Sequence, residues 1–558
     1  MPLSDLFANG KRPNLVFIIT DQERSVQHWP GFQAKLPAMQ QLAASGLTFN
    51  QAFTGACMCS PSRATFLTSN YPAVTGVTTT GSPEPPNALP NADTFPNLAS
   101  VLKRGGYSSC AWLGKWHLGG GGPDRYGFSG WVPPDAGNYL TINDTLGGGT
   151  PDNDGRFLTE ILGFLSTATK SSEPFCLVAS FVNPHDVYVG QFGPGTSGYS
   201  TADFSKVVVP LPANAKENLD TKPRAQAGMS WSNVQHSNSQ QDYVNFYAYL
   251  QTVVDGQIEQ ILGALQNVLD DTLIIRFADH GEMGLSHSLV EKFYNAYEET
   301  IHIPLIFSNP TVWPAGQTSD ALVSLVDLAP TLASLLDVQS DFPGFKGKDL
   351  TKVLDGVEPC VQNELHFTYD DIPTSLGPST IRTIRTAAYA YSVYFVDDGS
   401  DADWELYDLA ADPLENDNVA GTEVYGEIQS TLDTALQALM AANGTAPAFT
   451  WPPKQTADSR GGPPAVGANA QNVALAKEVD ALQVAGAGSV DRLSAILYAP
   501  QTPAHIVIRA ARALASLETP EAFTAMQPAL YGSWPRPVLA QVHDAYASRS
   551  RTSRGRSA

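Results

Sequence analysis

Cysteine is scarce in this sequence: the chain of 558 residues has five, at positions 57, 59, 110, 176 and 360. An odd number of scattered cysteines fits neither a disulfide framework nor a zinc-ligand pattern, and it is typical of proteins in a reducing cytoplasm. Long apolar runs are lacking too, and the longest ones (LVFII, CLVASFV and IPLIF) are too short to cross a bilayer. The first residues, MPLSDLFANGKRPNLVF, show no basic segment followed by an apolar core. We therefore expect no secretory leader, a cytoplasmic protein and no membrane partner.

Positive charge is in short supply as well, because 33 Lys and Arg residues face 55 Asp and Glu residues and the formal net charge is −22. A field of that sign repels nucleic acid and anionic membranes, so neither is expected as a partner. An anionic substrate would need a local cluster of Lys, Arg and His. The 43% of hydrophobic residues is ordinary for a folded protein, and the length suits one large domain with smaller appendages.

Short apolar runs alternate with helix-like stretches through the first two thirds of the chain. Continuously apolar runs predict strands buried on both faces at 14–20, 108–113, 175–182, 272–278 and 304–308. Amphipathic patterns predict helices at 37–45, 95–104, 157–168, 240–269 and 327–336. This alternation predicts an α/β fold with a large, mostly parallel sheet between helices. Sites in such sheets form at the carboxyl ends of strands, where Asp21 and Asp279 lie.

The pattern changes after about residue 360. Shorter strand-like pieces and one helical stretch predict a small antiparallel sheet domain at 361–443, after a large α/β domain at 12–360. Residues 444–468 are rich in Pro, Gly and Ala and read as a linker. The Ala-rich stretch 469–548 has a helical period, and 549–558 is a basic tail. We expect this extension to serve capping or homo-oligomer assembly.

The segment Cys59-Ser60-Pro61-Ser62-Arg63 comes directly before a helix-like stretch. A cysteine at a helix N-terminus is either a low-pKa nucleophile or a buried packing residue, and the residue type alone does not decide between them. The whole pentapeptide does, because C-x-P-S-R is the motif read by the enzyme that converts cysteine to formylglycine in type I sulfatases. Cys57 matches nothing in this motif, and we interpret it as a packing residue.

Three further segments, in the same order along the chain, match signatures of that family. They are GKWHLG at 114–119, DHGE at 279–282 with His287, Lys292 and YEE at 297–299, and WELYDL at 404–409 with its following Asp-Pro and Glu-Asn pairs. The sequence therefore resembles the type I sulfatases over about residues 12–440. The resemblance implies an alkaline-phosphatase-like α/β core with a smaller C-terminal domain, which agrees with the fold predicted from the periodicity.

The resemblance implies that Cys59 becomes formylglycine through the formylglycine-generating enzyme, and that the substrate is a small sulfate ester. A thiol is a poor attacker here, because the adduct would still have to be broken. An aldehyde hydrate offers two hydroxyls on one carbon: one attacks sulfur, and deprotonation of the other then expels sulfate and restores the aldehyde. This is covalent catalysis that splits one difficult step into two.

A divalent metal ion is the second cofactor that the resemblance implies. Its ligands correspond to Asp21, Gln22, Asp279 and His280, with residue 59 as a further one. Many family members have Asp-Asp and Asp-Asn where this chain has Asp-Gln and Asp-His, a variant that resembles choline sulfatases and phosphonate monoester hydrolases. An imidazole and fewer carboxylates favour Mn²⁺ over Ca²⁺, so both ions remain candidates.

Six residues correspond to catalytic positions of the family, with Cys59 as the nucleophile. Arg63 and Lys115 match cations that hold the hydrate and the sulfate oxygens, where fixed charge stabilises the transferred group. His117 matches the base that deprotonates the second hydroxyl. His185 and Lys292 match residues that contact sulfate and protonate the leaving oxygen. His287 also matches a family position, and we expect a hydrogen-bonding support role for it. Asp186 and Glu282 are expected to lie behind the site residues or at the surface and not to be catalysts.

Two alternatives remain open at this point. One is a phosphonate monoester or phosphodiester hydrolase on the same scaffold, because sulfur and phosphorus centres of this kind have similar shape and charge. The other is a scaffold protein that kept the fold and lost the chemistry. The intact GKWHLG segment favours sulfate, and the complete set of nucleophile, metal and cationic positions favours an enzyme.

Overall fold

The fold comes from a computed structural model of the chain. It describes residues 1–25, 35–80, 95–119, 121–133, 153–190, 199–234, 239–451, 481–499 and 504–527 except 518, with the single positions 32, 89, 135, 136, 475, 478 and 479. The predicted tail, most of the predicted linker and both ends of the predicted helical extension lie outside the described residues.

The described residues contain a central sheet of seven strands in the order β4-β5-β1-β6-β7-β2-β8. β7 runs antiparallel to both of its neighbours, and the others run parallel to one another, which confirms the predicted mostly parallel sheet. The bounds are β1 Asn14–Asp21, β2 Gly46–Phe53, β4 Cys110–Gly114, β5 Cys176–Pro184, β6 Thr272–Ala278, β7 Leu305–Ser308 and β8 Gln317–Ser324.

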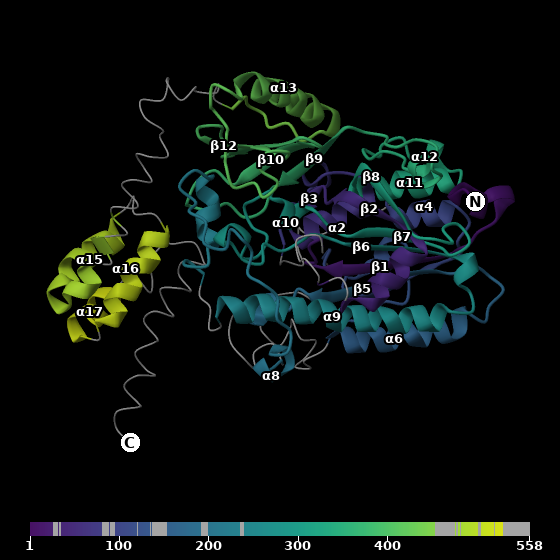
Figure 1. Cartoon of the computed structure of the whole chain (residues 1–558), viewed down its shortest axis with the longest axis horizontal. Helices are drawn as coiled ribbons and strands as arrows, with labels where there is room; N and C mark the ends of the chain where they lie inside the picture. Colours follow the sequence, from purple (N-terminus) through teal and green to yellow (C-terminus); the bar gives the residue numbers. More distant parts are fainter. Residues whose placement is uncertain are drawn as a thin grey trace.

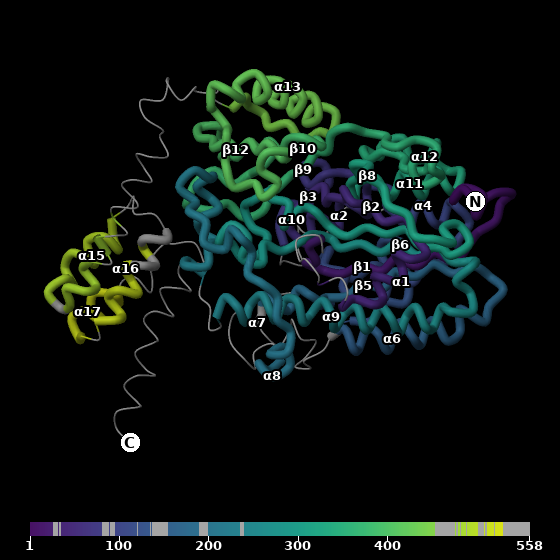
Figure 2. Tube along the Cα trace, in the orientation of Figure 1, coloured from purple at the N-terminus to yellow at the C-terminus, as the bar shows by residue number. Residues whose placement is uncertain are grey.

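Helices cover both faces of this sheet (Figure 1). Side chains alternate between the two faces along each strand, and apolar residues point to both of them. In β1, Leu15 and Phe17 belong to one apolar cluster, and Val16 and Ile18 belong to the other. The first cluster includes α4 Leu98–Arg104, α11 Leu328–Leu335 and part of α2 Cys59–Thr68. The second includes α1 Pro37–Ala44, α6 Asn153–Ala168 and α9 Gln240–Leu265. The short helices α7 Val187–Gly190 and α8 Thr201–Phe204 lie beside α9 (Figure 2).

A second sheet has five strands in the order β12-β11-β10-β9-β3 in the described part of the chain. Four of them form an antiparallel meander, β9 Glu364–Tyr369, β10 Thr380–Thr386, β11 Tyr389–Phe395 and β12 Ala402–Asp408. The fifth, β3 Ala56–Cys57, comes from the N-terminal part of the chain and pairs in parallel with β9. The helix α13 Gly426–Asn443 packs on this sheet. The residues just before Cys59 are therefore part of the smaller sheet.

The periodicity missed four strands, β2, β3, β8 and β10. β8 (QTSDALVS) is the edge strand, and its polar first half is mostly exposed. β2 (GLTFNQAF) lies between β7 and β8 and has polar residues at three partly buried positions. β3 has only two residues, too few for any pattern. The remaining helices of the described residues are α3 Pro72–Thr75, α10 Glu298–Ile301, α12 Thr351–Leu354, α15 Val490–Tyr498, α16 Ala504–Ser516 and α17 Pro520–Met526. None of the described helices is long and apolar enough to cross a membrane.

Candidate active site

The site begins where two neighbouring strands end. Asp21 is the last residue of β1, and Asp279 follows β6 directly. The two strands are paired in register, so both side chains emerge at one sheet edge, as the sequence predicted. The backbone N–H of Asp279 donates to the carbonyl of Thr20 at 3.1 Å and fixes the turn between strand and site.

Four side chains meet at this edge. Asp21, Cys59, Asp279 and His280 each offer one ligand atom, and these atoms lie within 4.8 Å of one another. The sulfur of Cys59 is 3.1 Å from Nε2 of His280 and 3.6 Å from Oδ1 of Asp21. All four side chains are fully buried. Two carboxylates, one imidazole and residue 59 at this spacing fit a single divalent cation, which supports the predicted metal site.

Helix α2 places the predicted nucleophile and the first predicted cation together. Cys59 is its first residue, and Arg63 is one turn later on the same face. The Arg63 guanidinium donates to Oδ2 of Asp21 and to Oδ2 of Asp279, each at 3.0 Å. It also donates to the Lys115 carbonyl at 3.1 Å. A buried guanidinium between two buried carboxylates compensates charges that would otherwise repel each other.

The GKWHLG segment supplies Lys115 and His117. Gly114 has φ +113°, and a Cβ there would lie 1.9 Å from the Ser180 carbonyl oxygen, so only glycine allows this close approach of β4 to β5. Lys115 Nζ lies 2.7 Å from Oδ2 of Asp21. His117 has φ +57° and adopts the left-handed region that non-glycine residues seldom occupy.

Asp135 holds this segment, and the sequence gave no sign of it. Its two carboxylate oxygens accept hydrogen bonds from the backbone N–H groups of Trp116 and His117 at 2.8 and 2.7 Å. Ser60 adds a further contact, because its hydroxyl donates to the His117 carbonyl at 2.6 Å. These contacts fix the backbone of His117 beside the start of α2. Asp135 belongs to no recognisable motif, and only its place in the fold reveals its role.

Lys292 and Gln22 form the other wall of the site. The Lys292 ammonium donates to the side-chain oxygen of Gln22 and lies 3.2 Å from Oε2 of Glu291. The Gln22 amide donates to Glu282 at 2.5 Å and to Glu291 at 3.1 Å. Gln22 thus lies next to the four-residue cluster with its oxygen directed at Lys292, and its assignment as a metal ligand stays a prediction.

The pKa values of the two central carboxylates, Asp21 and Asp279, are shifted in opposite directions. Burial alone would raise the pKa of Asp21, but Lys115, His185 and Arg63 outweigh it and hold that pKa well below its usual range. For Asp279, burial and the neighbouring charge of Asp21 raise the pKa to about 7. A bound divalent cation would neutralise both carboxylates, which is a further sign that the pair suits a metal.

The two predicted catalytic histidines are neutral in these surroundings. Burial, reinforced by the charge of Lys115, holds the pKa of His117 and the pKa of His185 well below the usual histidine value. Burial would also lower the pKa of Lys292, but Glu291 and Cys59 outweigh it and raise that pKa. The site therefore presents neutral imidazoles beside ammonium and guanidinium groups, the local positive charge that an acidic protein needs to receive an anion.

The residues expected to support the site lie around it. His287 hydrogen-bonds the Glu217 carboxylate (Nδ1 to Oε2, 2.5 Å), and its ring stacks on Tyr297 with centroids 3.9 Å apart. Glu282 accepts from Tyr243 and from the backbone N–H of Glu291 at 2.8 and 2.9 Å. Both side chains therefore hydrogen-bond to neighbouring residues, and their roles stay predictions.

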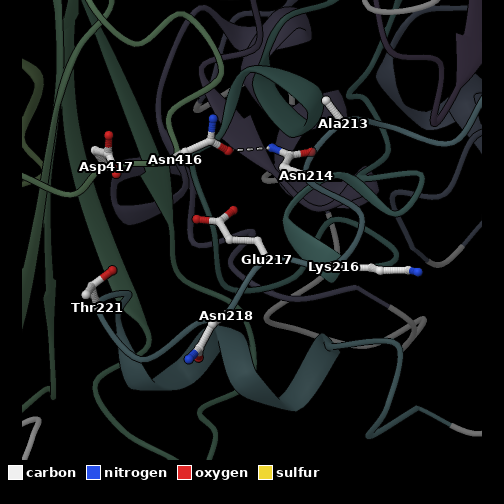
Figure 3. A pocket seen from close by; sticks show the side chains of 8 residues that line it. All are labelled: Ala213, Asn214, Lys216, Glu217, Asn218, Thr221, Asn416 and Asp417. Carbon is white, nitrogen blue, oxygen red and sulfur yellow. Dashed lines mark hydrogen bonds between the residues drawn. The ribbon is translucent and has the colours of Figure 1, made fainter.

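A hollow of about 500 Å³ is lined by Asn214 and Glu217, which both contact His287. Figure 3 shows the Glu217 carboxylate directed into this hollow. Asn214 donates to Asn416 across one side of it at 3.1 Å. Its lining contains none of the four clustered residues, so it is separate from the predicted metal site. Cys57 is fully buried in an apolar cluster.

Family comparisons agree with this geometry. The model of the sulfatase family matches residues 13–338, and that of the N-sulphoglucosamine sulphohydrolase C-terminal region matches 286–442. The chain is 27% identical over 455 residues to a Delta 4,5-hexuronate-2-O-sulfatase of Bacteroides thetaiotaomicron, covering 75% of this chain and 86% of that protein. It is 26% identical over 475 residues to a choline-sulfatase of Rhizobium meliloti, covering 78% and 88%.

Solved structures show the same fold. A protein solved in complex with its substrate D-glucosamine-2-N,6-O-disulfate superposes with a TM-score of 0.64 at 22% identity, covering 78% of this chain and 98% of that one. The phosphonate monoester hydrolase of Agrobacterium radiobacter superposes with a TM-score of 0.59 at 22% identity, covering 77% of this chain and 96% of that one. The family match and the sulfatase relatives favour an enzyme over a scaffold without chemistry. The chain belongs to the sulfatase family, and it is a hydrolase that acts on sulfate esters.

Proposed function

We propose that this enzyme cleaves sulfate monoesters with residue 59, converted from cysteine to formylglycine, as nucleophile and one divalent metal ion beside it. The observation that carries the proposal is the position of Cys59. It is the first residue of α2, and its sulfur lies 3.1 Å from His280 and 3.6 Å from Asp21, in the place that the hydroxyls of a formylglycine hydrate would take. The intact C-x-P-S-R segment supports conversion by a formylglycine-generating enzyme.

Asp21, Asp279 and His280 would hold the metal together with residue 59, and Gln22 is the remaining candidate ligand. When bound, a divalent ion lowers the pKa of a coordinated hydroxyl and polarises a sulfate oxygen. We assign Mn²⁺ or Ca²⁺ to the site, with Mn²⁺ favoured by the imidazole ligand.

The chain's own cations supply the remaining charge compensation. Lys115 and Lys292 are buried on two sides of Asp21 and Gln22, where an incoming sulfate would meet fixed ammonium groups. His117 is neutral and therefore able to accept the proton whose removal from residue 59 releases sulfate. His185 and Lys292 are assigned to sulfate contact and to protonation of the leaving oxygen.

Two buried cysteines allow a matched test of the nucleophile. Cys59→Ala is expected to abolish hydrolysis of 4-nitrophenyl sulfate, whereas Cys57→Ala, two residues away in the apolar cluster, keeps most of it. Both variants are compared by initial rates and by thermal unfolding, which separates lost chemistry from lost folding. Full activity of Cys59→Ala would end the proposal.

A phosphonate monoester or phosphodiester hydrolase is the second candidate. The Asp-Gln and Asp-His pairs favour it, because His280 takes part in the cluster where many family members have an oxygen ligand. Parallel kcat/KM measurements on 4-nitrophenyl sulfate and on a phenylphosphonate monoester decide between the two. We expect the sulfate to be the better substrate, and a clear preference for the phosphonate would reverse the assignment.

A further inference from the structure

The two predicted catalytic histidines follow neighbouring strands, beyond the point where those strands stop pairing. In the described part of the chain, the pairing of β4 with β5 ends at Gly114 and Ser180. His117 comes after that point on one chain, and His185 comes after it on the other. A buried backbone that leaves a sheet needs new acceptors for its N–H groups, because a buried N–H without a partner is costly. These acceptors therefore determine where the two histidines lie.

Asp154 supplies the acceptors on the His185 side. It lies in the first turn of α6 and is fully buried, and its two carboxylate oxygens accept from the backbone N–H groups of Val182 and Asn183 at 2.7 and 2.8 Å. Pro184 has no N–H, and the N–H of His185 donates to the Val182 carbonyl at 3.1 Å. The carboxylate thus fixes the backbone that leads into His185.

Asp135 makes the same kind of contact on the His117 side. One of its oxygens accepts from the backbone N–H of Trp116, and the other accepts from that of His117. Each aspartate therefore binds two successive N–H groups, one with each oxygen. Hydrogen bonds to a carboxylate are about twice as strong as those between neutral groups. A contact at two points fixes the orientation of a backbone segment as well as its position.

The two anchored segments are packed against each other. Ala136, Phe157 and Val182 are buried together in a small apolar cluster. Ala136 follows Asp135 directly, and Phe157 lies about one turn after Asp154 in α6. Val182 itself donates to Asp154. The two aspartates and the backbone that they hold therefore form one packed unit beside the site.

This unit reaches the metal-ligand candidates without contributing to them. Neither Asp135 nor Asp154 is among the four clustered side chains, and neither lies in a segment that matches a family signature. The register of β1 with β5 pairs Asp21 with Pro184, so His185 follows directly after a residue level with Asp21. A shift of the backbone at Val182 would therefore move His185 relative to the reacting groups.

We propose that Asp154 and Asp135 are positioning residues, each for one histidine and one step of the reaction. Asp154 places His185 for protonation of the leaving oxygen, and Asp135 places His117 for the release of sulfate from residue 59. The inference rests on the proposed function and deepens it, because it assigns the two steps to two separate backbone anchors. Loss of one anchor slows one step and spares the other.

The test compares Asp154→Asn with Asp135→Asn, since asparagine keeps the size of the side chain and replaces one acceptor oxygen by an amide that cannot accept. The probes are phenyl sulfate and 4-nitrophenyl sulfate, which have similar shapes and differ in how much the leaving oxygen needs a proton. A misplaced catalytic group costs up to about a hundredfold in rate. We expect the ratio of kcat/KM for phenyl sulfate to that for 4-nitrophenyl sulfate to fall about tenfold in Asp154→Asn, in the same direction as in His185→Ala.

Asp135→Asn should leave this ratio unchanged and act on the other step. We expect a larger fraction of the enzyme to carry sulfate on residue 59 during turnover, as in His117→Ala. The measurement is the intact mass of the protein after an acid quench. The double variant with Asp154→Asn and His185→Ala should show no lower ratio than His185→Ala alone, because the residue that Asp154 positions is already absent.

Asp255→Asn is the matched control. Asp255 of α9 accepts from the backbone N–H groups of Ala38 and Met39 at 2.9 and 3.0 Å, again one with each oxygen. It holds the start of α1, which carries none of the predicted site residues. This variant is expected to lower the midpoint of thermal unfolding and to change neither the ratio nor the sulfated fraction. Where an asparagine variant does not fold, the glutamate variant, which keeps both oxygens on a longer side chain, gives the same comparison.

Three results would overturn the inference: a ratio in Asp154→Asn no lower than in Asp255→Asn, the same kinetic change in Asp154→Asn and Asp135→Asn, or a further fall of the ratio in the double variant. If wild type hydrolyses neither ester, the proposed function itself fails. If wild type is active and His185→Ala leaves the ratio unchanged, the assigned role of His185 is wrong, and this inference is wrong with it.

Discussion

Arg63 shows how the residues of the site depend on one another. Its guanidinium lies between Asp21 and Asp279, and all three side chains are fully buried. Removing one partner of such a buried arrangement costs about 3–5 kcal/mol, because the remaining charges lose their compensation. Arg63 therefore orients both predicted metal ligands in addition to any contact it makes with a substrate.

Metal dependence is the first expectation at the scale of residues. Treatment with a chelator should remove activity, and Mn²⁺ should restore it at least as well as Ca²⁺, because His280 contributes an imidazole to the cluster. The measurement is the rate on 4-nitrophenyl sulfate after addition of single metals, alongside the metal content of the protein. Full activity of metal-free protein would exclude the assignment, and restoration by Ca²⁺ alone would contradict the preference.

The second expectation concerns His185 and the leaving group. A nitrophenolate leaves without a proton and an alkoxide does not, so His185→Ala should slow alkyl sulfates more than aryl sulfates. A well-placed general acid contributes about 10²–10⁴-fold, which makes the difference measurable as a steeper dependence of rate on leaving-group pKa. His117→Ala is the comparison, because it should instead trap sulfate on residue 59 whatever the leaving group. A uniform loss in His185→Ala would restrict that residue to binding sulfate.

At the scale of elements, the smaller sheet and helix α10 meet through buried charges. Glu415, which follows β12, lies 3.7 Å from Arg385 of β10 and accepts from the backbone N–H of Glu298 at 2.8 Å. Burial raises the pKa of Glu415 to about 8, only partly opposed by Arg385. The folded state therefore binds a proton at this carboxyl more tightly than the unfolded state, in which a glutamate has a pKa of about 4.3.

This shift predicts a pH dependence of stability. A raised pKa contributes stability that is fully present below about pH 4 and is lost as pH rises through about 8, the folded value. Glu415→Gln stays neutral, so its stability should fall less than that of wild type between about pH 5 and about pH 9. The difference is on the order of a few kcal/mol at most. The exposed Glu423→Gln is the control, and equal pH profiles of Glu415→Gln and wild type, measured by denaturant unfolding, would refute the assignment.

The sequence predicts some strands of this fold and misses others, depending on whether their pattern is local. Strands buried on both faces, such as β1 and β6, have continuous apolar runs, and the short motifs after them place Asp21 and Asp279 at one edge. Local patterns carry no information on long-range pairing. The two-residue strand β3 joins a sheet formed mainly more than 300 residues later in the chain, so its existence was not predictable. Asp135 was missed for another reason: it accepts hydrogen bonds from the backbone N–H groups of Trp116 and His117, and no sequence pattern marks such a contact.

At the scale of the whole molecule, the C-terminal segment 469–558 is predicted to take no part in catalysis. α15, α16 and α17 form an apolar cluster of their own. None of the clustered site residues comes from these helices. Deleting residues 469–558 should therefore alter elution on size exclusion or thermal stability more than the rate on 4-nitrophenyl sulfate. A folded truncated protein that binds metal and has lost activity would show that the segment serves catalysis.

The central claim is the identity of the nucleophile, and the mass of one peptide tests it most directly. Trypsin releases residues 36–63, which contain both Cys57 and Cys59. For protein made in a host with the converting enzyme, the account predicts a peptide in which Cys59 has lost its sulfur and two hydrogens and gained one oxygen, whereas Cys57 is unchanged. Fully active protein in which this peptide carries two intact thiols would contradict the account.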